Sequence, residues 1–100
     1  MSSKESQRRL LVERAAADVA TAWVESLIHE LRSEGRAVAG GWPGTLREGR
    51  GLLRSELATR GLQSMSFDEL ERAVRIAYAM ARRGWLVCAE TGDETTEASA

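Results

Sequence analysis

One long helical pattern constrains this chain more than any other feature of its sequence. Residues 5 to 34 contain no glycine and no proline. At 1.5 Å per residue they predict a helix about 45 Å long, with Ser3 placed to cap it and Gly35 placed to end it. Its apolar positions follow the spacing of one helix face: Val12, Ala16, Val19, Ala20, Trp23, Val24, Leu27, Ile28 and Leu31. Such a helix cannot cover its own stripe, so other helices must lie along it.

A second, shorter helix follows a linker, residues 35 to 44, that holds the only proline of the chain. Pro43 favours an extended conformation for Trp42, so no helix crosses this point. Thr45 and Glu48 form a capping-box pattern that starts the next helix, and Gly61 ends it. We expect its apolar face to consist of Leu46, Gly49, Leu53 and Leu57, with Leu52 beside it. Glycines at 49 and 51 each cost up to about 1 kcal/mol of helix propensity, so this helix requires tertiary contacts.

A third helix starts at a second capping-box pattern, formed by Ser66 and Glu69. We expect Gly84 to end it, with WLVC following as a short extended segment or a further turn. The tail, ETGDETTEASA, is acidic and nearly free of apolar residues, which is typical of disorder. The expected inner face of the helix contains Phe67, Leu70, Val74, Ala77, Tyr78 and Ala81.

Together these elements predict an all-α fold, a small three-helix bundle in which one long N-terminal helix is packed by two shorter helices. The alternative is an obligate dimer in which the long helices of two copies pair. We expect a single helical domain over residues 6–89, between a disordered N-terminus, residues 1–5, and a disordered acidic tail, residues 90–100.

Composition narrows the class of protein. One hundred residues correspond to one domain, and the net charge of −1 excludes a polycation. No apolar run approaches the roughly 18 residues of a membrane span, and no secretory signal is recognisable. A lone Cys88 forms no internal disulfide and fits a reducing, cytoplasmic compartment. Thirteen of the fourteen basic residues are arginine and asparagine is absent, a bias that suggests a bacterial source.

Catalysis finds little support in the sequence. His29 and Cys88 are the only histidine and the only cysteine, and a nucleophilic pair would need them within hydrogen-bond reach, with a third orienting group. The glycines of GGWPGTLREGRG lack the lysine and hydroxyl residue of a phosphate loop. No carboxylates stand at metal-ligand spacing. We therefore expect no enzyme, no cofactor and no metal.

The arginine row, which consists of Arg47, Arg50 and Arg54, is the first candidate binding surface. The three residues fall on one side of the second helix, and residues 36 to 60 carry five arginines against two glutamates. Such a row could bind phosphate or an acidic partner. The alternative is a solvated face that pairs with Glu25, Glu30 or Glu34 of the first helix.

Trp42 is the second candidate. Either it folds back as a plug that closes the end of the bundle near Trp23 or Trp85, or it stays exposed and anchors a partner. The two glycines before it favour close packing, so we interpret the linker mainly as a lock for the chain reversal. Its exposed side, together with the neighbouring arginine row, is the predicted contact surface.

We therefore predict a non-catalytic helical protein–protein interaction module, a small adaptor or regulatory subunit that contacts its partner through Trp42, Arg47, Arg50 and Arg54. The partner is another protein or a second copy of this chain, and no membrane is involved. The alternative is a nucleic-acid-binding regulator with a degenerate helix-turn-helix in residues 45–84. Against it, the recognition helix would begin Phe67-Asp68-Glu69, and its two carboxylates would repel phosphates.

Overall fold

The first helix closely matches the sequence prediction. The computed structural model describes residues 3–38, 41–62 and 64–99. In it α1 spans Ser3–Ser33. Gly35 follows with a φ of 72°, the left-handed conformation that glycine adopts without steric cost. The amide of Arg36 donates to the carbonyl of Leu31 at 2.8 Å, which is the hydrogen bond expected of a glycine-terminated helix.

The second helix also begins and ends where the sequence indicates. α2 spans Leu46–Thr59, and Thr45 and Glu48 form the complete capping box in front of it. Gly61 has a φ of 72°, and the amide of Leu62 donates to the carbonyl of Leu57 at 2.7 Å. Both ends of α2 therefore follow from local sequence.

The third helix is longer than the sequence predicts. α3 spans Phe67–Ser99, so Gly84 does not end it, and α3 is not one of two short helices. Trp85, the next residue, is only 2% exposed, and continued helix is what carries its side chain into the core. A Cβ at Gly84 would lie 3.6 Å from a side-chain carbon of Val24 on α1, an ordinary van der Waals distance, so the packing of α1 and α3 does not require a glycine at this position.

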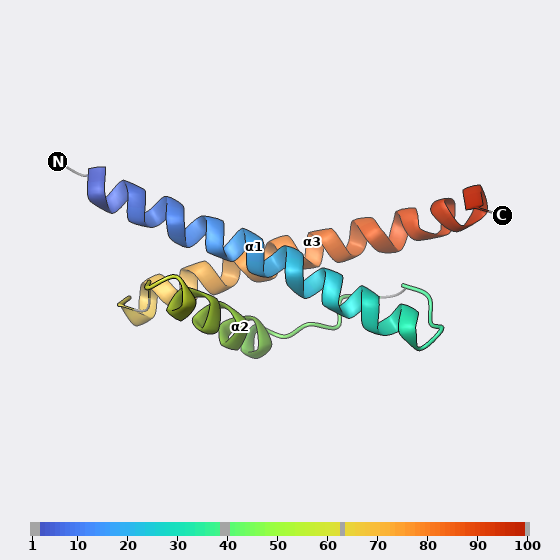
Figure 1. Ribbon diagram of the computed structural model, residues 1–100, viewed down its shortest axis with the longest axis horizontal. Helices are drawn as coiled ribbons and strands as arrows, with labels where there is room; N and C mark the ends of the chain where they lie inside the picture. The colour runs from blue at the N-terminus through green and yellow to red at the C-terminus, as the bar shows by residue number, and fades with distance from the viewer. Residues whose placement is uncertain (1–2, 39–40, 63, 100) are drawn as a thin grey trace.

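Two segments for which the sequence predicts disorder have helical backbone here. α1 includes residues 3–5 of the N-terminus, and α3 includes the tail as far as Ser99. The end of α3 extends away from the other two helices (Figure 1). The division into one domain over residues 6–89 with flexible ends stays a prediction.

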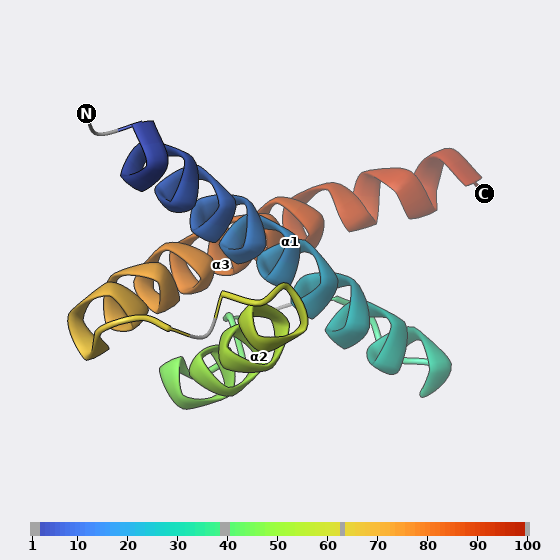
Figure 2. The same cartoon turned by 60° about the vertical axis from the view of Figure 1, so that its left-hand side comes forward.

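The three helices pack against one another as a small all-α bundle. α1 and α3 run in the same direction and cross near the middle of the molecule, and α2 lies on one side of the crossing (Figures 1 and 2). The apolar stripe of α1 is covered within a single chain: all nine of its predicted positions are buried or half-buried. The homodimer stays a prediction. None of the described helices is long and apolar enough to cross a membrane.

Small residues at the crossing let α1 and α3 approach closely. Ala15 and Ala16 of α1 and Ala77 and Ala81 of α3 are completely buried. Two clusters of buried side chains lie along the crossing. The first joins all three helices around Leu53, Leu57 and Val74, and the second joins α1 and α3 around Trp23, Val24, Ile28 and Trp85.

Two predicted inner residues are on the surface. Phe67 is 72% exposed and Leu46 is 45% exposed. Each is the first residue of its helix, directly after a capping residue. Because both residues lie at the very start of a helix, at the edge of the bundle, helical periodicity does not place their side chains against the core.

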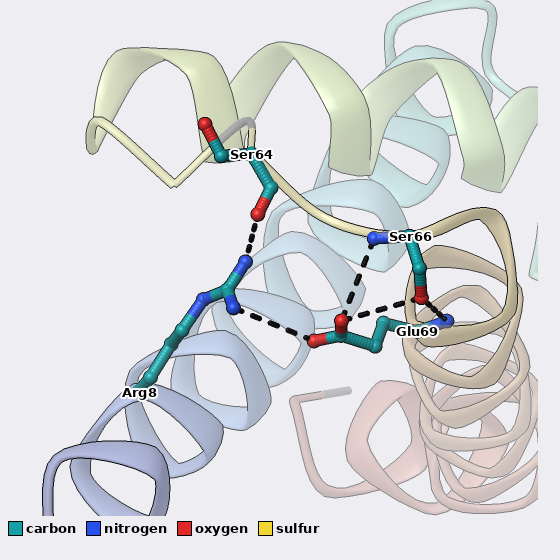
Figure 3. Close-up of polar contacts among 4 residues, drawn as sticks. All are labelled: Arg8, Ser64, Ser66 and Glu69. Carbon is teal, nitrogen blue, oxygen red and sulfur yellow. Dashed lines mark hydrogen bonds and ion pairs between the residues drawn. The ribbon is translucent and has the colours of Figure 1, made fainter.

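The start of α3 is joined to the start of α1 by Arg8 (Figure 3). Its guanidinium donates to the backbone carbonyl of Ser64 and lies 3.8 Å from the carboxylate of Glu69. The same carboxylate accepts from the hydroxyl of Ser66, whose oxygen accepts from the amide of Glu69. Both ionic side chains are more than a third exposed, so this pair orders the α2–α3 connection more than it stabilises the fold.

Glycine at 44 is required by the tryptophans around it. A Cβ at Gly44 would lie 2.6 Å from Cε2 of Trp42 and 2.7 Å from Cζ2 of Trp23, whereas a Cβ at Gly51 would meet nothing within 4 Å. We expect Gly44→Ala to lower the free energy of unfolding by about 1–3 kcal/mol through overpacking. Gly51→Ala, the matched control, should raise it by up to about 1 kcal/mol through helix propensity. Urea denaturation followed by circular dichroism measures both, and equal effects would contradict this account of Gly44.

Candidate functional site

Trp42 lies inside an aromatic cluster with Trp23, Tyr78 and Trp85. Its ring centroid is 4.9 Å from that of Trp23, 6.2 Å from that of Tyr78 and 5.9 Å from that of Trp85, each with an edge-to-face geometry. Aromatic pairs favour this geometry because ring edges are positive and ring faces negative. The arrangement agrees with the interpretation of Trp42 as a plug. Because the ring is half-buried against its neighbours, little of it remains for a partner.

One polar atom of this cluster is left unsatisfied. Nε1 of Trp42 is buried and has no hydrogen-bond partner among the described residues. A buried donor without an acceptor costs roughly 1–3 kcal/mol. The apolar and aromatic contacts of the ring therefore hold it in place, and they offset the free-energy cost of burying its N–H group without an acceptor.

One arginine of the arginine row forms an ion pair with another helix, and the other two are exposed. Arg50 donates from Nε and from one terminal nitrogen to the two carboxylate oxygens of Glu71, at 2.6 and 2.7 Å. The partner lies on α3, so Arg50 does not form the ion pair with a carboxylate of α1 that the alternative interpretation of the row implied. Arg47 and Arg54 are exposed and have no ion pair within 4.0 Å among the described residues.

The bidentate pair shifts the titration of both its members. The hydrogen bonds from Arg50 lower the pKa of Glu71 below its ordinary value of 4.5, against the opposing effect of desolvation, and the charges of Arg50 and Arg75 lower it further. The same hydrogen bonds and charge raise the pKa of Arg50. Arg50 therefore stays a cation that is bonded to α3. This bond holds the side of α2 that carries the arginine row in a fixed direction.

The two residues of the possible nucleophilic pair lie in different surroundings. His29 is exposed on α1, while Cys88 is half-buried against the second core cluster. No hydrogen bond joins the two within the described ranges. Within those ranges there is also no group of three histidine, cysteine or carboxylate residues that could hold a metal ion.

A groove between α1 and α2 is a feature that the sequence analysis did not identify. Its volume is about 860 Å³ and it is open to solvent. Its apolar lining consists of Val19, Ala22, Trp23, Leu27 and Leu52. Leu52 is 44% exposed although it belongs to the apolar side of α2. We refer to this feature as the α1–α2 groove.

The charged residues that line the α1–α2 groove are all acidic: Asp18 of α1 and Glu48 and Glu56 of α2. Arg60 bonds to Asp18 at 2.7 Å and to Glu56 at 2.8 Å. One guanidinium therefore pairs with two of the three carboxylates, while the third, Glu48, bonds to Thr45 in the capping box; the lining keeps an excess of two negative charges. The groove combines an apolar wall with a negative surface.

The two flanks of α2 thus differ in charge. At 100° per residue, Leu52 and Glu56 point to the side nearly opposite the arginine row. The sequence does carry one indication of the α1–α2 groove, because Leu52 lies beside the main apolar face of α2. Whether that leucine would be covered or exposed depends on how closely α1 and α2 approach, and periodicity does not contain that distance.

Trp42 offers a direct test of the plug. We expect Trp42→Ala to lower the free energy of unfolding by about 3 kcal/mol, the lower range for truncation of a buried tryptophan. Trp42→Phe should cost less than half as much, because it keeps an aromatic ring and removes the unsatisfied N–H. Urea denaturation by circular dichroism gives both values. A loss within about 0.5 kcal/mol for the alanine variant would show that Trp42 is not part of the core.

The Arg50–Glu71 pair predicts a pH dependence. The pKa of Glu71 is lower in the folded chain than its ordinary value, so the pair stabilises the fold above that value and loses its effect as the pH falls through the folded pKa. Wild type should therefore be more stable than Glu71→Gln at neutral pH, and the difference should shrink towards about pH 3. Urea denaturation at both pH values measures this, and a difference that grows on acidification would contradict the assignment.

Comparisons with protein-family models, with curated proteins and with solved structures found no match to this chain. Its site is therefore assigned from chemistry and geometry, and those point to the two flanks of α2.

Proposed function

We propose that this chain is a non-catalytic helical interaction module, an adaptor or regulatory subunit that binds an acidic segment of a partner protein on the arginine row of α2. The observation that carries the proposal is the state of the five arginines in residues 36 to 60. Arg36, Arg50 and Arg60 each bond to a carboxylate. Arg47 and Arg54 are exposed and have no such bond to a described residue.

Arg50 prepares the row for binding. Its guanidinium is held by two hydrogen bonds to Glu71, which fixes the flank of α2 against α3. Arg47 and Arg54 stand three positions before it and four positions after it on the same side of the helix. They present two planar forks, each able to bind a carboxylate through two parallel hydrogen bonds.

Trp42 supports this surface indirectly. Its contacts with Trp23 fix the chain just before Thr45, where α2 begins. We therefore assign Trp42 the role of positioning α2 and assign the direct contacts to Arg47 and Arg54.

The helix-turn-helix alternative gains no support from the start of α3. Asp68 and Glu69 are exposed in its first turn, and Glu69 is already bonded to the capping residue Ser66 and paired with Arg8. A phosphate backbone brought to this turn would meet two carboxylates. The binding experiment below therefore includes a DNA duplex as the alternative ligand.

The test is a double variant, Arg47→Glu/Arg54→Glu, which leaves Arg50 and its pair intact. The matched control is Arg14→Glu/Arg32→Glu, two exposed arginines of α1 with the same change in net charge. The probes are a fluorescein-labelled glutamate-rich peptide and a labelled DNA duplex, titrated at low and at physiological salt. We expect the peptide to bind wild type and the control, and the double variant to lose at least about tenfold in affinity.

Two results would overturn the proposal. Equal losses in the double variant and the control would mean that only net charge matters. Tighter binding of the duplex than of the peptide, with a steep decline in affinity as salt rises, would indicate a nucleic-acid-binding protein. Circular dichroism of both variants checks that helicity is unchanged.

A further inference from the structure

We infer that the α1–α2 groove binds an amphipathic helix whose apolar face is flanked by lysine or arginine residues. This surface lies on the other flank of α2 from the arginine row and takes a partner of the opposite charge, so the inference goes beyond the function proposed above. It rests on the apolar wall, the acidic lining and the small side chains that allow close approach.

Part of the apolar wall stays uncovered in the single chain, although Val19 and Trp23 are buried in the core. Leu52 is 44% exposed and Leu27 is half-buried, although both line a groove between two packed helices. An isolated exposed leucine needs no explanation, but an exposed leucine and a half-buried one that share one concave surface form an apolar site.

Small side chains line both walls of the groove, and their spacing suits a helix. Ala22 and Ser26 stand one turn apart on α1, and Gly51 and Ser55 stand one turn apart on α2. Small side chains at this spacing leave room for the ridge of a third helix between two others. The α1 residues of the groove run from Asp18 to Leu27, a rise of about 14 Å, which corresponds to two to three helical turns.

Charge selects the kind of helix. Asp18, Glu48 and Glu56 line the groove, and Arg60 neutralises only part of that charge. Carboxylates come from both of the helices that form the groove. A helix that carries cations on either side of its apolar face would therefore pair with both walls at once, whereas one flanked by carboxylates would be repelled.

The experiment uses the full chain and two synthetic peptides as probes. Both peptides have the same leucine and alanine face on a helix of about four to five turns, and both carry a fluorescein label. One has lysines beside that face and the other has glutamates. Fluorescence anisotropy at physiological salt should show binding of the lysine peptide, and at least about tenfold weaker binding of the glutamate peptide.

Matched variants locate the binding surface. Leu52→Lys places a cation in the groove and should weaken the lysine peptide at least about tenfold. Leu86→Lys is its control, because Leu86 is a similarly exposed leucine, at 41%, on α3. Asp18→Asn/Glu56→Gln should also weaken binding, while Glu25→Gln/Glu30→Gln, a pair of exposed carboxylates on α1 outside the groove, should leave it unchanged.

Each other result overturns the inference. Equal affinity for the two peptides removes the charge argument, and equal loss in Leu52→Lys and Leu86→Lys places the binding elsewhere. If neither peptide binds, the groove is not a helix site of this kind; a dimer in sedimentation that Leu52→Lys dissolves would then identify its occupant as a second copy. Arg47→Glu/Arg54→Glu should bind the lysine peptide no more weakly than wild type, which separates this test from that of the proposed function.

Discussion

The contact between the linker and Trp23 is the interaction on which the arrangement of the chain depends. Gly44 and Gly49 have no side chain, and this absence lets the indole of Trp23 lie against the linker and against α2. Trp42 covers the same ring from another side. Because α1 and α3 already meet through small residues at their crossing, this aromatic contact, together with the buried Leu53 and Leu57, places α2 and sets the direction of both of its flanks.

The position of α2 gives the molecule two surfaces of opposite character. One flank has a cation fixed by Glu71 between two exposed arginines that have no ion pair with any residue the structure describes. The other flank shares an acidic, apolar groove with α1. Although the net charge of the chain is only −1, positive and negative side chains are therefore separated onto different sides of α2. Such a helix could join an acidic and a basic partner without the two competing for one surface.

Much of the fold could be predicted from the sequence, because its rules are local. The capping boxes at Thr45 and Ser66 and the helix stops at Gly35 and Gly61 depend on neighbouring residues, and all four are present. The continuation of α3 through Gly84, the ion pair of Arg50 with α3 and the groove beside Leu52 depend on distances between helices. A pattern along the chain does not contain those distances, so these features required the structure.

The gathering of all three tryptophans in one aromatic cluster has a consequence for how this protein can be observed. Trp23 and Trp85 each contact Trp42, so intrinsic fluorescence and near-ultraviolet dichroism both arise from the same end of the bundle. The cluster around Leu53, Leu57 and Val74 contains no tryptophan. An intermediate in which that part of the core has opened would keep its tryptophan signals, and amide exchange or a probe placed in that cluster would reveal it.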